Sequence, residues 1–418
     1  MSWQDEFDVE NGVLRRYLGR RRNVTVPDWV TDVGDEAFFC CMTIRRVLLP
    51  EGLRSIGRMA FSGCAQLQSV RVPDSVTAIG DWAFTYCSLL SAIRLPEGLQ
   101  YLGMGVFSSC RSLLRLDLPP SVTEVKDWSF NGCRSLQTPG LSARVNTVSY
   151  QAFSSCSGLQ TVRLPEGVTA VGSHAFSNCG NLLSAYLPDS VTSVGDEAFG
   201  DCPQLAELRV PEGRVRWGRH VFSGCRALAD ESGFIILRGV LQEYAPPDGG
   251  AESPKVRDVT LPDTATDAAA EVFSGMKLVL RVRRWFPGLA AALEGCELLA
   301  LVTEEPSPVP PRFLRAARIG AALGETPPEP EALTWLRRHA ASLCREALEL
   351  PQLLRFLCEH RLLPPGASDD WLAETAARKM SEPTALLLEY QAALGPETMR
   401  RARAARRGRR TDEEETAP

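Results

Sequence analysis

Apolar residues recur along the first two thirds of this chain with a period of 23 residues. In each period a phenylalanine is followed three residues later by a cysteine and three residues after that by an aliphatic residue, nine times in phase. From the aliphatic column onward, apolar residues such as Leu67, Val70 and Val72 have the spacing of a short strand with inward-facing alternate side chains. A unit this short cannot bury a core by itself, so the period predicts a solenoid of about ten stacked coils. The phenylalanine and cysteine columns of this ladder are Phe38, Phe61, Phe84, Phe107, Phe130, Phe153, Phe176, Phe199, Phe222 and Cys41, Cys64, Cys87, Cys110, Cys133, Cys156, Cys179, Cys202, Cys225.

The remainder of each coil is predicted from turn chemistry. In one unit Pro73 presets φ for a turn, and Val76 and Ile79 then face the core. We expect Gly80 to occupy a turn position with positive φ. The stretch that begins at Ala83 is expected to form a short helical or 3₁₀ turn before the cysteine returns the chain to the core. The coils around residues 119–153 depart from this pattern in several turn positions.

Two segments are predicted to be hairpins. Residues 1–22 contain an Asn11-Gly12 tight-turn signal and predict a hairpin that caps the first coil and covers its strand edge. Between Phe222 and Phe273 the chain has 28 residues more than one period, which predicts a hairpin and loop insert at about 230–255. The solenoid is therefore predicted over residues 23–277.

The last third of the chain changes from strand to helix periodicity. Residues 278–303 predict a β-α-β closing cap, and the proline-rich residues 304–311 predict an extended linker. Residues 312–395 predict a small all-α module, in which apolar residues from Leu333 to Leu350 recur on one helical face. Residues 396–418 hold seven arginines followed by acids and predict a charged, disordered tail.

Helix boundaries in this module are predicted from proline and capping residues. Pro351 is expected to open a helix, and Ser368, followed by two aspartates, is expected to cap the next one. Pro383 is expected near the start of the last helix.

The repeat pattern V-x-L-P-[DE]-[GS]-V-x-x-[IV]-G-x-x-A-F-x-x-C-x-x-L resembles the BspA-like branch of the leucine-rich repeat proteins over residues of about 10 to 300. The resemblance implies a right-handed α/β solenoid with a parallel sheet on its concave side. It also implies binding of other proteins, without chemistry of its own, and many members are exported surface proteins. The helical module weakly resembles ankyrin-like helix pairs.

Composition narrows the classes of function. A hydrophobic share of 44% excludes a wholly disordered chain, and a net charge of −5 argues against general binding to nucleic acids. No apolar run is long enough for a membrane-spanning helix, and the N-terminal residues lack the features of a signal peptide. Thirteen cysteines then predict reduced thiols and a cytoplasmic location.

The sequence offers no motif for catalysis, a cofactor or a metal. The cysteine column is interpreted as small buried side chains, while Cys40 is expected to face outward and is the candidate reactive thiol. His174 and His220 share one repeat column two coils apart, roughly 10 Å, which is too far for one metal ion. We interpret this column as a tolerant surface, and the chain as a protein that is not an enzyme.

The outward positions of the predicted strands, on the concave face of the solenoid, form the candidate binding face. Arginines are frequent on it, and an acidic column runs along the turns that follow the strands. Two interpretations stay open: the two columns screen each other, or the face binds an acidic, extended partner. The candidate partner-binding residues are Arg46, Arg71, Arg94, Arg115, Arg163, Tyr186 and Arg209, and the acids include Glu51, Asp74, Glu97, Glu166, Asp189 and Glu212.

The first hypothesis for function is therefore a protein–protein interaction scaffold of unknown partner and oligomeric state. One alternative is a nucleic-acid-associated or regulatory factor that acts through the arginine-rich tail, because arginines make salt-sensitive phosphate contacts. Another is a surface adhesion protein exported without a recognisable signal.

Overall fold

A computed structural model describes residues 6–245, 257–304, 308–321, 323 and 330–404 of the chain. The chain divides into two compact units, Met1–Gly250 and Ala251–Pro418, and each is described by itself. The division falls inside the insert that the sequence predicts at about 230–255. The last predicted coil, around Phe273, thus belongs to the second unit.

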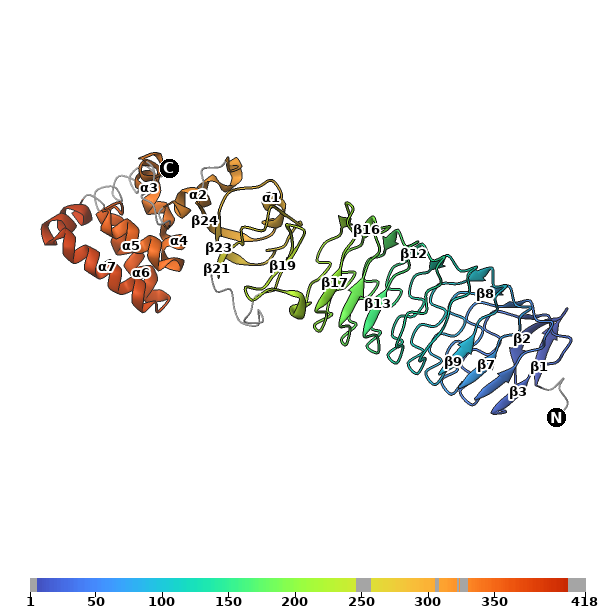
Figure 1. Ribbon diagram of the computed structural model, residues 1–418. Coiled ribbons are helices and arrows are strands. Elements are labelled where there is room, and N and C mark those ends of the chain that lie inside the picture. Colours follow the sequence, from blue (N-terminus) through green and yellow to red (C-terminus); the bar gives the residue numbers. More distant parts are fainter. Residues whose placement is uncertain (1–5, 246–256, 305–307, 322, 324–329, 405–418) are drawn as a thin grey trace, which may run out of the picture. The chain divides into compact units, whose positions relative to one another are not determined.

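The first unit is a solenoid that carries two kinds of parallel sheet (Figure 1). Strands of three residues form one sheet of four strands and one of three, and each strand pairs with the strand 23 residues further on. We call the surface of these strands the long-strand face. Its strands are β3 (Asn23–Thr25), β5 (Arg46–Leu48), β7 (Ser69–Arg71), β9 (Ala92–Arg94), β13 (Thr161–Arg163), β15 (Ser184–Tyr186) and β17 (Glu207–Arg209).

Strands of two residues form the other kind of sheet, on the next side of each coil. They pair in the same parallel register, as Ala78 with Ser55 and Tyr101 with Ala78. These strands are β4 (Asp32–Val33), β6 (Ser55–Ile56), β8 (Ala78–Ile79), β10 (Tyr101–Leu102), β11 (Glu124–Val125), β12 (Thr147–Val148), β14 (Ala170–Val171), β16 (Ser193–Val194) and β18 (Arg216–Trp217).

The long-strand face is interrupted where the sequence is irregular. After β9 the ladder continues only as an isolated bridge between Ala92 and Arg115, and regular strands resume at β13. Pro139 stands here at the position that Val162 holds in the following coil. Proline has no N–H to donate to a ladder, so this coil cannot pair as its neighbours do.

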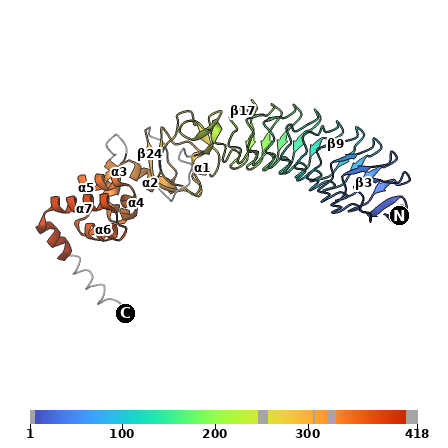
Figure 2. The same cartoon turned by 90° about the horizontal axis from the view of Figure 1, so that it is seen from below.

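The phenylalanine ladder lies inside the stack, as the period predicts. Neighbouring rings from Phe38 to Phe222 lie with centroids 4.8 to 5.9 Å apart and planes within 20° of parallel. All nine rings are buried. Tyr17 extends the row beyond Phe38 at 5.3 Å. Figure 2 shows the coils stacked along a curved axis.

The turn that holds each phenylalanine differs from the predicted helical turn. It consists of consecutive β-turns, and the residues two before and two after each phenylalanine have positive φ, as Trp82 (59°) and Tyr86 (59°) do. The expectation for Gly80 is wrong, because positive φ is found at neighbouring positions instead. Gly80 is required for close approach: a Cβ there would lie 2.6 Å from the backbone nitrogen of Arg58 in the preceding coil.

Hairpins lie at both ends of the first unit. Strands β1 (Phe7–Glu10) and β2 (Val13–Tyr17) pair antiparallel around Asn11-Gly12, and β2 pairs in parallel with β4. This hairpin therefore extends the short-strand sheet and not the long-strand sheet, which begins at β3. At the other end, η2 (Arg226–Leu228) precedes an antiparallel hairpin of β19 (Phe234–Leu237) and β20 (Val240–Tyr244).

The second unit begins with a three-stranded parallel sheet in the order β21-β23-β24. Helix α1 lies between β23 and β24, and the other helices follow the sheet along the chain. The strands of this unit are β21 (Arg257–Thr260), β22 (Asp267–Ala268), β23 (Lys277–Val282) and β24 (Glu297–Thr303). The helices are α1 (Leu289–Ala292), η3 (Pro311–Phe313), α2 (Leu314–Gly320), α3 (Pro330–His339), η4 (Ala340–Leu343), α4 (Cys344–Glu349), α5 (Pro351–Glu359), α6 (Pro365–Ala377) and α7 (Ser381–Leu394).

Sheet and helices of this unit share one core, so the predicted linker does not separate two compact parts. Val279 and Ala300 of the sheet belong to the same buried cluster as Ile319, Leu336 and Leu354 of the helices. Gly320 of α2 allows this packing, because a Cβ there would lie 1.9 Å from the carbonyl oxygen of Leu301 in β24.

Several helix boundaries differ from the sequence predictions. The apolar face from Leu333 to Leu350 is divided among α3, η4 and α4. Ser368 is not a cap but a buried residue inside α6, where its hydroxyl donates to the carbonyl of Pro365 at 2.7 Å. Pro351 opens α5 as predicted. Residues 396–404 are helical and not part of a disordered tail, while residues 405–418 lie outside the described residues.

Candidate functional site

The long-strand face brings three of the candidate arginines against carboxylates. Arg71 lies 3.0 Å from Glu51, and Arg94 lies 3.7 Å from Asp74, each an acid that follows the strand of the preceding coil. Arg115 lies 3.1 Å from Asp117. All three pairs are largely exposed, where an ion pair contributes ~0–1 kcal/mol. On these coils the acidic column screens the arginines.

Among the described residues, Arg163 contacts an aromatic ring and not a carboxylate. Its guanidinium carbon lies 3.7 Å from the ring centroid of Tyr186, its register partner on the next strand. The Tyr186 hydroxyl donates to a carboxylate oxygen of Glu207 at 2.6 Å, and Arg209 is the register partner of Tyr186 on the far side. A guanidinium stacked on a ring keeps its in-plane N–H donors directed outward, where they suit a carboxylate.

Arg46 and Arg209 are exposed at opposite parts of the same face. Within residues 6–245 neither lies within 4.0 Å of a carboxylate oxygen. The seven candidate residues therefore fall into three groups: arginines paired with acids, the stacked Arg163 and Tyr186, and the two unpaired arginines.

The cysteine column makes a regular set of hydrogen bonds that sequence reasoning missed. Each buried thiol donates to the carbonyl oxygen of the phenylalanine in the preceding coil, as Cys110 does to Phe84 at 3.2 Å and Cys133 to Phe107 at 3.1 Å. Burial raises the pKa of the Cys133 thiol to about 12 and that of Cys110 well above its ordinary value. Because the thiolate is the nucleophile, these cysteines are structural.

The expected difference between the vicinal cysteines is present. Cys40 is exposed, whereas Cys41 is half-buried and its pKa is raised, chiefly by burial. All thirteen cysteines of the chain lie among the described residues, and all are free.

The histidine column is not a row of independent surface residues, contrary to our interpretation of the sequence. The rings of Trp82 and Trp128 lie 5.7 Å apart, across a coil that has Gly105 in this column. Trp128 donates from its indole nitrogen to Gln151 at 2.8 Å. Further along, His174 lies 3.6 Å from Glu197.

At the end of this row the hairpin strand β20 contributes a carboxylate. His220 lies 3.5 Å from Glu243, a buried residue whose pKa is raised by burial. These contacts join side chains of successive coils. These contacts could have been predicted from the sequence, because residues 23 apart occupy one column and lie side by side.

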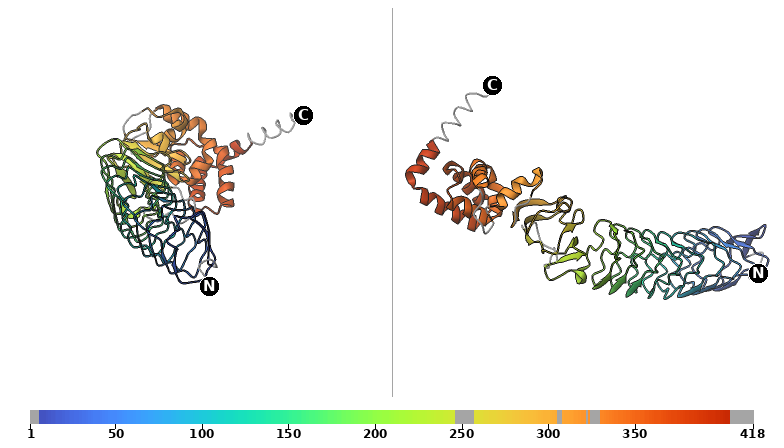
Figure 3. Two further views of the ribbon diagram at one scale, coloured as in Figure 1. Left: turned by 90° about the vertical axis from the view of Figure 1, so that its right-hand side faces the viewer. Right: turned by 45° about the horizontal axis from the view of Figure 1, so that its top comes forward.

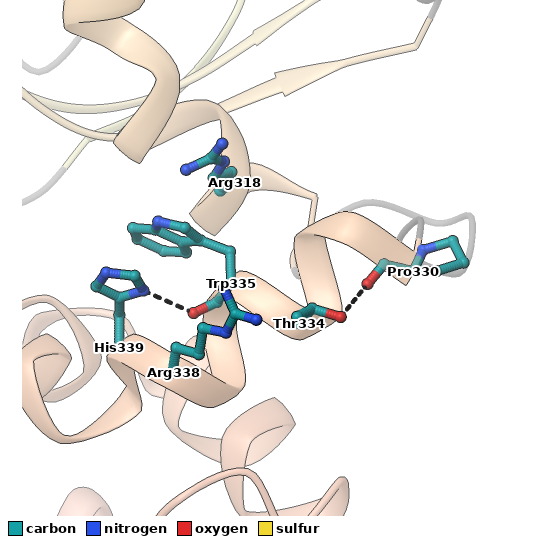
Figure 4. A pocket seen from close by; sticks show the side chains of 6 residues that line it. All are labelled: Arg318, Pro330, Thr334, Trp335, Arg338 and His339. Carbon is teal, nitrogen blue, oxygen red and sulfur yellow. Dashed lines mark hydrogen bonds between the residues drawn. The ribbon is translucent and has the colours of Figure 1, made fainter.

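The hollows of the described residues show no arrangement of a catalytic site. In one of about 370 Å³ in the second unit, Trp335 lies between Arg318, 5.4 Å from its ring, and the stacked imidazole of His339 (Figure 4). His339 donates from Nδ1 to the carbonyl oxygen of Trp335 at 2.8 Å, and Thr334 donates to that of Pro330 at 2.8 Å. Both polar side chains are thus engaged with their own helix. Across the described part of the chain, no three metal-ligating side chains gather at one point.

These features define the class of protein: a repeat protein whose stacked coils expose long, regular surfaces. The sequence pattern of the family described as BspA type leucine rich repeat region (6 copies) matches residues 17–137 and 110–229, together just over half of the chain. The chain belongs to this family of BspA-type leucine-rich repeat proteins.

Solved structures of bacterial leucine-rich repeat proteins are similar to this chain. A leucine-rich repeat protein of T. pallidum is 29% identical, with 55% of this chain and 90% of that chain covered and a TM-score of 0.31. A leucine-rich cell surface protein of Faecalibacterium prausnitzii is 22% identical, with 74% and 94% covered and a TM-score of 0.40. The pneumococcal vaccine antigen PcpA is 18% identical, with 69% and 79% covered and a TM-score of 0.40.

No curated protein matches the chain. Among the helices of the described residues, none combines the length and the apolar character needed to cross a membrane.

Proposed function

We propose that this protein is a non-enzymatic scaffold that binds an acidic, extended segment of another protein on its long-strand face. The observation that carries the proposal is Arg163, whose guanidinium is stacked on Tyr186 and not paired with an acid. Arg209, the register partner of Tyr186 on the next strand, adds a second exposed cation. Arginine and tyrosine are the residues that most often dominate the energy of protein interfaces.

The test is charge reversal on the face. The partner is first identified by mass spectrometry after co-purification with the tagged full chain, and its affinity is then measured at two salt concentrations. The triple variant Arg71→Glu, Arg94→Glu, Arg163→Glu should bind at least about tenfold more weakly. The exposed triple Arg54→Glu, Arg111→Glu, Arg134→Glu, whose residues lie outside the long strands, changes net charge equally and serves as the control. Equal affinity of both triples would refute the proposal.

The alternative of nucleic-acid binding through the arginine-rich segment is less favoured by the described part of that segment. Arg403 donates two hydrogen bonds to Asp369, at 2.8 and 2.9 Å, and Arg401 pairs with Glu397 at 2.5 Å. Two of the seven arginines are thus engaged with acids of the protein itself. An RNA-binding measurement with and without residues 400–418 decides between the two functions.

We further propose a cytoplasmic location, where thirteen free thiols stay reduced. The similar protein of Faecalibacterium prausnitzii is described as a cell surface protein. Digestion of intact cells with an added protease separates the two locations, because only a surface protein is cleaved. The helices of the second unit are proposed to dock a second partner. Because they share a core with the sheet of that unit, the whole unit (Ala251–Pro418) is deleted as the test, which should leave binding at the long-strand face unchanged.

A further inference from the structure

Strand β3 is an open edge of the long-strand sheet. The sheet runs in the order β3-β5-β7-β9, whereas the N-terminal hairpin continues the other sheet through β2 and β4. Among residues 6–245 no strand pairs with β3 on the side away from β5. Figure 3 (left) looks onto this N-terminal end of the stack. The hairpin thus covers one sheet edge and leaves the other uncovered.

The open edge presents backbone groups in a fixed pattern. Arg46 donates from its backbone nitrogen to the carbonyl oxygen of Arg22 at 3.1 Å, and Val26 donates to that of Leu48 at 3.0 Å. In a parallel ladder alternate residues bond to opposite neighbours. Asn23 and Thr25 therefore direct their N–H and C=O groups away from β5, toward the position of an added strand.

A hollow of about 370 Å³ lies against this edge. Its lining has a polar part, to which Asn23 and Thr25 and the paired Glu6 and Arg21 contribute, and an apolar part formed by Phe7, Pro27 and Trp29. Trp29 is 47% exposed, which is unusual for so large a side chain. An extended chain laid on β3 would bring its alternate side chains to this hollow, as strand addition requires.

Unpaired arginines surround the start of the strand. Arg20 and Arg22 precede β3, and Arg46 is the register partner of Asn23. All three are exposed, and within the described residues none of their guanidinium groups lies within 4.0 Å of a carboxylate oxygen. Arg21 is instead paired with the buried Glu6 at 2.7 Å. The end of the edge that adjoins Asn23 is therefore strongly basic.

We propose that an acidic, extended segment of a partner protein adds to β3 as a further strand of this sheet. Its main chain pairs with Asn23 and Thr25, its carboxylates meet Arg20, Arg22 and Arg46, and an apolar side chain enters the hollow. The inference rests on the proposed function, because it takes the same class of partner. It adds the place where that partner's backbone binds, which the long-strand face alone does not specify.

An array of random decapeptides, probed with the fluorescently labelled full chain, tests the inference. Captured peptides should be enriched in Asp, Glu and β-branched residues, and the strongest of them is resynthesised for affinity measurements. Thr25→Pro removes the outward N–H but leaves the bonds of Val24 and Val26 to β5 in place, and proline is tolerated on an edge strand. It should weaken the peptide roughly tenfold, whereas Thr25→Val, which keeps the N–H, should leave affinity unchanged.

A second variant tests the charges without changing the strand. Arg20→Glu with Arg22→Glu should weaken the same peptide by about tenfold or more, and raised salt should weaken binding to the unchanged chain. Melting temperatures within about 2 °C of the unchanged chain would show that each variant is folded. An array that captures no acidic peptide would overturn the inference. So would a peptide that binds Thr25→Pro as tightly as Thr25→Val, or a single-stranded oligonucleotide that binds better than the peptide.

The outcome also separates this inference from the proposed function. If the triple variant of Arg71, Arg94 and Arg163 loses the peptide and Thr25→Pro retains it, binding on the face stands and the β3 edge fails. If only the edge variants lose the peptide, strand addition stands and binding at Arg163 fails.

Discussion

The residue type that recurs in the phenylalanine column and in the cysteine column is explained by the contacts of its side chain. Phenylalanine stacks on the ring of the next coil, and cysteine combines a small volume with a thiol that reaches the phenylalanine carbonyl of the preceding coil. Alanine would remove the thiol donor and leave the carbonyl only the backbone N–H of its own coil, as Phe130 accepts from Cys133 at 3.1 Å, and a larger side chain would not fit between the coils. The repeated cysteine is therefore explained by packing and hydrogen bonding together.

Truncation of a ladder ring should be costly. Phe130 is 1% exposed and lies between Phe107 at 5.7 Å and Phe153 at 5.0 Å. Phe130→Ala removes both ring contacts and leaves a cavity, so we expect a loss of about 3–5 kcal/mol in unfolding free energy. Urea unfolding followed by circular dichroism measures it. Arg94→Ala, on the exposed face, should change the value by no more than about 0.5 kcal/mol.

Alkylation should distinguish the two vicinal cysteines. Cys40 is exposed, whereas burial raises the pKa of Cys41 and lowers its thiolate fraction. With limiting iodoacetamide near neutral pH, mass spectrometry of peptides should find Cys40 labelled first. Column thiols such as Cys110 should react only after unfolding. Labelling of Cys41 at the rate of Cys40 would contradict the structure.

At the scale of elements, the distance between coils is set by glycine as much as by strands. Gly57, Gly80 and Gly103 stand at the same turn of successive coils, and a Cβ at any of them would lie within 2.6 Å of backbone in the coil before. At these three coils a hydrogen atom as the side chain leaves room for the close approach. Ser149 stands at the same turn of a later coil, where its backbone nitrogen still donates to the carbonyl of Val125 at 2.8 Å.

Gly80→Ala tests this close approach. The added methyl would meet the backbone nitrogen of Arg58, which cannot rotate away, so the two coils must separate. We expect a loss of about 1–3 kcal/mol, the cost of overpacking. Gly98→Ala is the matched control, because no atom lies within 4 Å of its added methyl and its φ is not positive. Thermal unfolding measures the stability of both variants, and equal melting temperatures would contradict the requirement for glycine at position 80.

The period of the sequence predicted the elements of the solenoid, but not the partners of their side chains. Phe84 and Cys87 were placed correctly, because 23-residue spacing alone brings equivalent residues together. Gly80 was misinterpreted, since a glycine required by a neighbouring coil looks the same in sequence as one required by φ. The shared columns place Arg163 next to Tyr186. Whether the guanidinium stacks on that ring or pairs with a neighbouring acid depends on the side-chain rotamers, which the period does not predict. The prediction that Ser368 caps a helix was wrong, because the helix already begins at Pro365.

At the scale of the whole molecule, stacking turns one feature of a coil into a property of the first unit. The long-strand face repeats an arginine and an acid on successive coils; within the described part of the chain, three of its six candidate arginines are paired with acids, whereas Arg46, Arg163 and Arg209 are not. The proposed binding therefore depends on the coils where the arginine–acid repeat is broken. The buried thiols are repeated along the stack in the same way, so their effects on stability add up.

Alkaline pH should destabilise the solenoid steeply. Burial raises the folded-state pKa of the column thiols Cys87, Cys110, Cys133 and Cys156, to about 12 for Cys133, above an unfolded value near 9. Above pH 9 the unfolded chain thus releases protons that the folded chain retains, so stability is full below pH 9 and is lost as the pH rises toward 12. Each such thiol contributes about 1.4 kcal/mol per pH unit in this range, and Cys87, Cys110 and Cys156 add to Cys133 in the same direction. Urea midpoints at pH 8, 9 and 10 measure how steeply stability falls with pH. Cys133→Ala should reduce this slope by the contribution of one thiol. A midpoint that does not fall over this range would refute the buried, neutral column.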